Sequence, residues 1–145
     1  MATSAFKRKA PGATAAQIAS LTSWLGHEIP GAYRDLLAET DGAETWWDAA
    51  DGRGRESLVL WSTGEVPELN EAYEIGRYLP GIVAIGSDGG DDAIVLDMTL
   101  ADEADAWPVV RIGFGNLDRQ DFVLQAPTFE DWARDGFRLK PGWWT

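Results

Sequence analysis

The first strong pattern in the chain is an apolar repeat at helical spacing. It follows the sequence TAAQ at residues 14–17, a capping box in which Thr14 and Gln17 each accept a hydrogen bond from the other's backbone N–H. The apolar residues that come next are expected to face a core: Ile18, Leu21, Trp24 and Leu25. The pattern therefore predicts a helix here. The basic segment before it, residues 1–12, is expected to be a flexible arm.

Two further helices are predicted before the middle strands. Pro30 suits the first position of a helix, and Asp41-Gly42 supplies a stop. The inward stripe of this helix is predicted to be Tyr33, Leu36 and Leu37. Good helix formers over residues 68–78, before a Leu-Pro-Gly stop, predict a shorter third helix.

Short β-type runs occupy most of the remaining chain. Residues 43–57 are punctuated by Gly and Asp and predict a loop or loose hairpin before a run at 58–61. The stretch IVAIGSDGGDDAIVLDM, residues 82–98, predicts two paired strands joined by an acidic, glycine-rich turn. Further strands are expected within 107–115, where Pro108 is tolerated only at a start or an edge, and at 121–126.

The closing sequence PTFEDWARDGF predicts one more helix, capped by Thr128 and Asp131 and ended by Gly136. Strands and helices do not alternate regularly along the chain. This order favours an α+β fold over a doubly wound one. A chain of 145 residues that is 45% hydrophobic is long enough for one domain with its own core.

The inventory of reactive side chains is short. Cysteine is absent and His27 is the one histidine, which excludes disulfides, thiolate zinc sites, Cys–His nucleophiles and two-histidine metal sites. His27 is expected to be an ordinary residue between two helices. We also find no long apolar run and no signal peptide, so the protein is expected to be cytoplasmic, without a membrane partner.

The net charge of -12 argues against nucleic acid as a partner and favours a basic protein partner. Acidic residues are concentrated in the middle of the chain, between Asp35 and Asp105, where the basic residues are Arg53, Arg55 and Arg77. Such a field steers a cationic partner towards the protein. The alternative is that the acidic surface only keeps the protein soluble.

The acidic turn SDGGDD, residues 87–92, was compared with known ligand loops. Its carboxylates do not fall at the Ca²⁺-binding positions of an EF-hand, and no GK[ST] sequence or helix follows that would make it a phosphate loop. Gly89-Gly90 readily adopts the backbone angles of a hairpin turn. We therefore interpret the segment as a turn, with a solvated tip that argues against paired carboxylate catalysis.

Tryptophan is abundant, with eight residues in the chain. Two adjacent pairs stand out, Trp46-Trp47 and Trp143-Trp144, because neighbouring residues on a strand point to opposite faces. One ring of each pair is expected in the core and the other at the surface, where Trp beside acids is typical of an interface anchor. The alternative is that all these rings fill the core.

Three stretches, in this order, resemble the SUKH superfamily, whose founding members are the Smi and Knr cell-wall regulators of yeast. They are IPGAYRDLLAETDGAE, LPGIVAIGSDGGDDAIVLDM and APTFEDWARDGF, and the resemblance spans about Ile18 to Phe137. It implies an α+β fold with a single domain over residues 13–145, in which a curved, mostly antiparallel sheet packs against several helices. It also implies that GSDGGDD is a structural hairpin.

Bacterial members of this superfamily are mostly immunity proteins, which bind a co-encoded toxin, often a nuclease or a deaminase, and block it without catalysis. The resemblance thus implies a non-catalytic protein-binding module, a monomer by default, whose partner is a basic toxin domain. The alternative is a regulatory scaffold of the yeast type, which predicts long disordered flanks. The short arm and the tail RLKPGWWT favour the immunity protein. A carboxylate-dependent enzyme is the third hypothesis, and it requires a concave pocket with perturbed carboxylates.

An acidic inhibitor can enter the basic substrate groove of a nuclease by mimicking phosphate charge, while aromatic anchors supply desolvated contact. We hypothesise a partner-binding surface built from two segments of the chain: Glu44, Trp46, Trp47, Asp48, Asp88, Asp91 and Asp92. No catalytic residue, metal ligand or cofactor is predicted.

Overall fold

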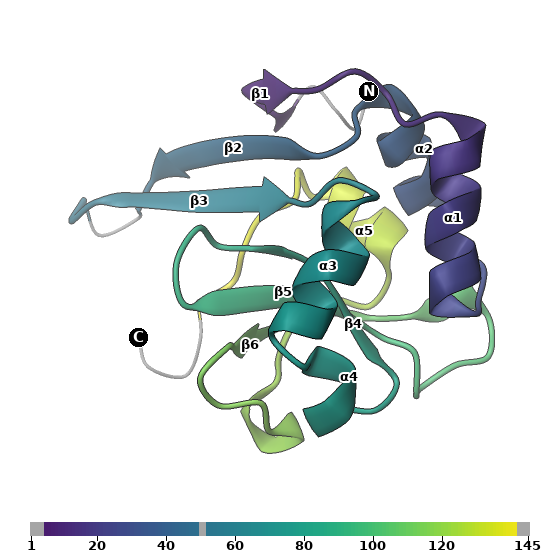
Figure 1. The fold of residues 1–145 in the computed structure, drawn as a ribbon. Helices are drawn as coiled ribbons and strands as arrows, with labels where there is room; N and C mark the ends of the chain where they lie inside the picture. The colour runs from purple at the N-terminus through teal and green to yellow at the C-terminus, as the bar shows by residue number, and fades with distance from the viewer. Residues whose placement is uncertain (1–4, 50–51, 142–145) are drawn as a thin grey trace.

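The computed structural model describes residues 5–49 and 52–141, so the expectation for Trp143-Trp144 lies outside the described residues. Within them the chain forms one antiparallel sheet whose strands lie side by side in sequence order. The strands are β1 (Arg8–Lys9), β2 (Ala43–Asp48), β3 (Arg55–Leu60), β4 (Ile82–Ser87), β5 (Asp92–Asp97), β6 (Val109–Gly113) and β7 (Val123–Ala126). The sheet curls into a half-barrel (Figure 1). The expected α+β fold with a curved antiparallel sheet is confirmed.

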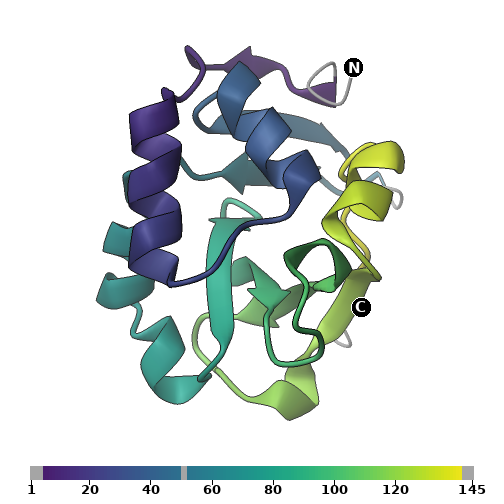
Figure 2. The ribbon, with the colours of Figure 1, turned by 90° about the vertical axis from the view of Figure 1, so that its right-hand side faces the viewer.

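The helices pack around this sheet. They are α1 (Ala15–Leu25), α2 (Gly31–Glu39), α3 (Glu65–Ala72), α4 (Ile75–Tyr78) and α5 (Phe129–Arg134), with short 3₁₀ turns η2 (Ala104–Ala106) and η3 (Arg119–Asp121). α2 lies between α1 and α5, while α3 and α4 contact β4 and α5 contacts β7 (Figure 2). The core between helices and sheet includes Tyr33, Leu58, Ile94, Trp107 and Trp132.

The predicted helix ends are largely correct. The capping box at Thr14 and Gln17 is present, with hydrogen bonds of 3.1 and 2.8 Å. The Thr128 side chain accepts a hydrogen bond from the Asp131 N–H at 3.1 Å. Pro30 is the residue just before α2 rather than its first residue. Short polar side chains and proline define these ends locally, which is why the sequence predicts them.

Three elements differ in detail from the expectation. Trp24 does not face the core, since 38% of it is exposed. Of the loop or loose hairpin expected over residues 43–57, the structure has the hairpin, and it is regular rather than loose, because β2 pairs with β3 along its length. The third helix starts at Glu65 and is split in two, because Glu74 has a left-handed φ of 56° that no continuous helix contains.

Residues 5–12 also differ from the expected flexible arm, because they pack onto the domain. Phe6 is buried against Phe137, with ring centroids 4.8 Å apart. The Lys7 N–H donates to the Glu44 carbonyl at 3.0 Å, so the segment continues the sheet beside β2. The buried ring, the edge of β2 and hydrogen bonds such as that from the Ala10 N–H to the Thr40 hydroxyl at 2.8 Å together hold a segment whose composition predicts mobility.

Candidate functional site

The acidic turn between β4 and β5 is held from inside the molecule by Arg111. The Arg111 side chain, on β6, donates from Nε to Asp92 Oδ2 at 2.8 Å and from Nη2 to Asp88 Oδ2 at 3.0 Å. A third bond runs to the Lys140 carbonyl at 3.1 Å. Asp92 is only 7% exposed. The solvated tip expected from the sequence therefore applies to Asp91, which is exposed, and not to Asp88 or Asp92.

The turn itself has the geometry that the glycines predict. Gly89 has a φ of 81°, and Asp88 Oδ1 accepts hydrogen bonds from the backbone of Gly90 and Asp92 at 2.8 and 3.1 Å. Because these carboxylate oxygens are engaged by the turn and by Arg111, they stabilise the hairpin. Sequence reasoning missed Arg111, although an arginine within the apolar run VVRIG is the signal of a buried charge that needs acidic partners.

The other group of predicted site residues lies on β2. Glu44 forms an ion pair with Arg8 at 3.7 Å, and Asp48 is exposed. Trp47 is partly buried and donates from Nε1 to Glu56 at 2.9 Å, whereas Trp46 lies on the opposite face. The structure thus places the Trp47 ring against the core and the Trp46 ring on the opposite face of the strand, and both rings are half-buried.

Trp46 is surrounded by cations. Lys7 Nζ, Arg8 Cζ and Arg55 Cζ lie 5.1, 5.2 and 5.5 Å from its ring centroid, and Lys7 also donates to the Trp46 carbonyl at 2.8 Å. A hollow of about 500 Å³ beside Trp46 and Trp47 is lined further by Arg134 and Arg138. The surroundings of Trp46 are therefore rich in positive charge, a feature that the sequence analysis did not anticipate.

The fold brings the β2 residues and the turn close together. Ser57 on β3 is the cross-strand partner of Trp46, and a Cβ added to Gly89 would lie 3.3 Å from the Ser57 Cβ. The two predicted segments thus share one region of the surface. Its charge is mixed, because Arg8 pairs with Glu44 and Arg111 with Asp88 and Asp92.

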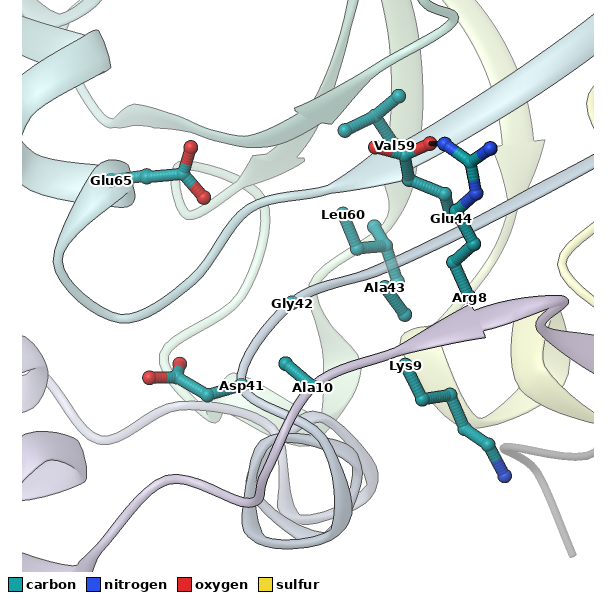
Figure 3. A pocket seen from close by; sticks show the side chains of 10 residues that line it. All are labelled: Arg8, Lys9, Ala10, Asp41, Gly42, Ala43, Glu44, Val59, Leu60 and Glu65. Atoms are coloured by element: carbon teal, nitrogen blue, oxygen red, sulfur yellow. Dashed lines mark ion pairs between the residues drawn. The ribbon is translucent and has the colours of Figure 1, made fainter.

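A small hollow of about 240 Å³ lies beside β1 (Figure 3). Ala43, Val59 and Leu60 provide apolar lining, and Asp41 and Glu65 approach from one side. Asp41 accepts hydrogen bonds from the Thr63 N–H and hydroxyl at 2.7 and 3.2 Å. Figure 3 shows Lys9 pointing away from the hollow. Since both signs of charge surround this space and Asp41 is engaged, it does not select an ion of either sign.

A larger hollow of about 450 Å³ lies between α1, α3, α4 and the start of β4, and we call it the α1–α4 groove. Its apolar floor is formed by Leu25, Ile82, Val83 and Met98, and its rim by Trp24, Glu71, Glu74 and Arg77. Trp24 on this rim is 38% exposed. Tyr78 is not part of the lining, but it follows Arg77 in sequence, is 56% exposed, and lies with its ring centroid 5.6 Å from the Arg77 guanidinium carbon.

Acidic residues continue from this groove around the same side of the molecule. Glu68 is exposed on α3, next in the series to Glu71 and Glu74. A neighbouring hollow of about 560 Å³ contains four carboxylates but two basic side chains, His27 and Arg34. The carboxylates are those of Glu28, Asp102, Glu103 and Asp105. His27 lies between α1 and α2 and meets Trp107 edge-on at 5.9 Å, in agreement with an ordinary interhelix residue.

A metal site or a membrane-spanning helix would point to another kind of function. Residues 5–49 and 52–141 contain no cluster of three or more His, Cys, Asp or Glu side chains that could hold a metal ion. Nor does this part of the chain form a helix of the length and hydrophobicity that crossing a bilayer requires. Surface charge and exposed aromatic rings are therefore the features on which a functional proposal rests.

Comparison with protein families gives one match. The model of the SMI1 / KNR4 family (SUKH-1) matches residues 12–135, a range that contains every helix described above and strands β2 to β7. Strand β1 lies outside the matched range. A search of curated proteins finds no match.

Proposed function

Because the chain belongs to the SMI1 / KNR4 family (SUKH-1), we propose that it is a non-catalytic protein-binding module that acts as an immunity protein. In this proposal it binds a co-encoded toxin domain of the nuclease or deaminase type in the cytoplasm and neutralises it by direct contact. The observation that carries the proposal is the family match together with an acidic surface on which aromatic side chains are exposed.

The physical argument concerns charge complementarity. A nuclease needs a basic groove to hold the phosphates of its substrate. A protein of net charge -12 is attracted to such a groove, and its carboxylates compete with the substrate for the same cations. Exposed aromatic side chains then add desolvated contact area, which gives the complex a long lifetime. Inhibition by occlusion requires no catalytic residue.

The test is co-expression of the tagged chain with the product of the adjacent gene, followed by purification at salt concentrations from about 0.05 to 0.5 M. We expect a stoichiometric complex with a basic protein, weakened as the salt concentration rises, and loss of that protein's toxicity. Capture of cell-wall or signalling proteins instead would support the scaffold alternative. Absence of any basic partner would contradict the immunity proposal.

A further inference from the structure

We propose that the α1–α4 groove is the docking site for a cationic segment of the protein partner, a segment that carries Arg or Lys beside an apolar side chain. The inference rests on the proposed function, because it assigns the surface through which the partner is bound. It differs from the hypothesis drawn from the sequence, which places the contact at β2 and the acidic turn. The two surfaces are formed by different residues and can be tested against each other.

The floor of the groove calls for an apolar group. Leu25, Ile82, Val83 and Met98 line a space of about 450 Å³, and Trp24 stands at its rim with 38% of its surface exposed. Patches in which exposed aromatic side chains adjoin apolar lining are typical of protein-binding surfaces. An aliphatic side chain of a partner would cover the floor and the exposed part of the Trp24 ring.

The rim calls for positive charge. Trp24 Nε1 lies 3.4 Å from Glu71 Oε1, a long hydrogen bond that leaves this carboxylate available to a stronger donor. Glu74 pairs with Arg77 at 2.7 Å, but both side chains are largely exposed, and such surface pairs are readily exchanged. A guanidinium or ammonium group of the partner fits between Glu71 and Glu74, with Glu68 adding to the local field.

The backbone at Glu74 provides an independent argument. Glu74 has φ 56° and ψ 37°, a left-handed conformation that is unfavourable for a residue with a side chain. A glycine would adopt the left-handed conformation at this break between α3 and α4 with less strain. Residues held in unfavourable backbone conformations cluster at functional sites. A glutamate at this position is explained if its carboxylate at the rim contributes to binding.

Charge disfavours one other occupant of the groove and one other surface for the partner. A second copy of this chain carries the same net charge of -12, so docking its surface on the acidic groove is opposed by repulsion. The surface around Trp46 presents Lys7, Arg8 and Arg55, which repel a basic partner. The groove and the adjoining carboxylates of residues 102–105 have the sign that attracts one.

The first experiment needs no toxin. A ¹⁵N-labelled full-length chain is titrated with the peptide acetyl-Arg-Leu-Arg-Leu-Arg-amide, and the control is acetyl-Glu-Leu-Glu-Leu-Glu-amide. We expect the indole N–H signal of Trp24 and the amide signals of Glu71 and Glu74 to shift with the cationic peptide only, and the indole signal of Trp46 to stay in place. Shifts confined to Trp46 and the acidic turn between β4 and β5, or no shift at all, would overturn the inference.

The second experiment uses the toxin and two variants with the same change of charge. Glu71→Gln with Glu74→Gln alters the groove, and Glu44→Gln with Asp48→Asn alters strand β2 of the β2–β3 hairpin. We expect the groove variant to weaken toxin binding by about tenfold or more and this hairpin variant to leave it nearly unchanged. Equal weakening, or weakening by the hairpin variant alone, would overturn the groove assignment.

These two experiments separate the inference from the proposed function. If no basic toxin binds the parent chain, the immunity proposal fails, while the peptide titration still decides whether the groove accepts a cationic segment. If the toxin binds and the groove variant binds as tightly as the parent, the immunity proposal stands and the groove inference fails.

Discussion

Tyr33 contains the one buried side-chain polar atom of the described residues for which the structure shows no hydrogen-bond partner, its hydroxyl oxygen. Burial of the ring, with the charge of Asp41 adding to it, raises the pKa of this hydroxyl well above its ordinary value. An unpaired buried hydroxyl destabilises the fold, because it loses its bonds to water on folding. The remainder of the side chain is well packed, since Tyr33 contacts the ring of Phe129 at 5.1 Å.

We predict that Tyr33→Phe keeps or raises the free energy of unfolding at neutral pH, by up to about 1 kcal/mol. The pKa of Tyr33 is higher in the folded than in the unfolded state. As the pH rises above the unfolded value of about 10, the unfolded state releases the Tyr33 proton first, so the free energy of unfolding falls there and is unaffected by this group at lower pH. The variant should lose less stability than the parent between neutral pH and strongly alkaline pH. Urea unfolding at a series of pH values measures this difference, and a variant that is less stable at neutral pH would contradict it.

Arg111 is the residue on which the acidic turn depends. Its removal leaves Asp88 and Asp92 with no cation at their buried side, and breaking a buried pair costs more than the pair contributes in net terms. We predict that Arg111→Met lowers the free energy of unfolding by about 3–5 kcal/mol. Adding Asp88→Asn and Asp92→Asn should restore part of the loss, because it removes the unpaired charges. Chemical denaturation of the two variants tests this prediction, and a single variant as stable as the parent would contradict it.

At the scale of elements, Asn70 joins α3 to the sheet. Strand β3 pairs with β4 only as far as Gly86 and Ser87, and beyond that point the edge of β4 has no neighbouring strand. Here the Asn70 amide substitutes for a neighbouring strand. Its oxygen accepts from the Ala84 N–H at 2.8 Å, and its nitrogen donates to the Ala84 carbonyl at 2.7 Å. The same side chain donates to the Val66 carbonyl at 2.6 Å. One amide thus satisfies the backbone of both elements.

We predict that Asn70→Leu lowers the free energy of unfolding by about 2–4 kcal/mol, because the Ala84 N–H and carbonyl are then buried without partners. The matched control is Glu68→Gln on the exposed face of the same helix, which should change stability by less than about 0.5 kcal/mol. The two midpoints of urea unfolding give the comparison. Equal midpoints for both variants would show that Asn70 does not hold β4.

The break between α3 and α4 is the element-scale feature that links stability to binding. We predict that Glu74→Gly leaves the fold as stable as the parent or stabilises it slightly, because glycine adopts the left-handed conformation without the cost of a side chain. The same variant should bind the basic partner more weakly, because a rim carboxylate is lost. Thermal unfolding and a binding titration are measured together. A fall in stability with unchanged binding would contradict both parts.

The features that the sequence predicts are those with local causes. Thr14, Gln17 and Thr128 define helix ends through bonds to residues three positions away, so the sequence predicts their roles. The paired strands at 82–98 are predicted because an apolar run and a glycine turn are also local. The sequence does not predict the roles of Arg111 and Asn70, because each depends on a partner at least fourteen residues away. The exposure of Trp24 was missed because helical spacing alone does not show where the covered face of a helix ends.

For the whole molecule, the important property is the separation of charge. The hairpin of β2 and β3 lies at the opposite end of the protein from α4 (Figure 1). The cations around Trp46 come from this hairpin, Arg55, and from the segment that pairs with it, Lys7 and Arg8. The groove and residues 102–105 carry an excess of carboxylates. A protein with this distribution of charge has a dipole moment as well as a net charge, and an electric field orients it. The basic partner that we propose would therefore be guided to one end of the protein before contact.

This orientation leads to a kinetic prediction for the complex with the basic partner. Neutralising Glu71 and Glu74 removes field at the docking end, so the association rate constant should fall and should depend less steeply on salt concentration. Trp24→Ala removes contact area but no charge, so it should mainly raise the dissociation rate constant. Surface-based or stopped-flow kinetics over a salt series measures both constants. If the charge variant changed only dissociation, or the Trp24 variant only association, the roles assigned to the carboxylates and the ring would be wrong.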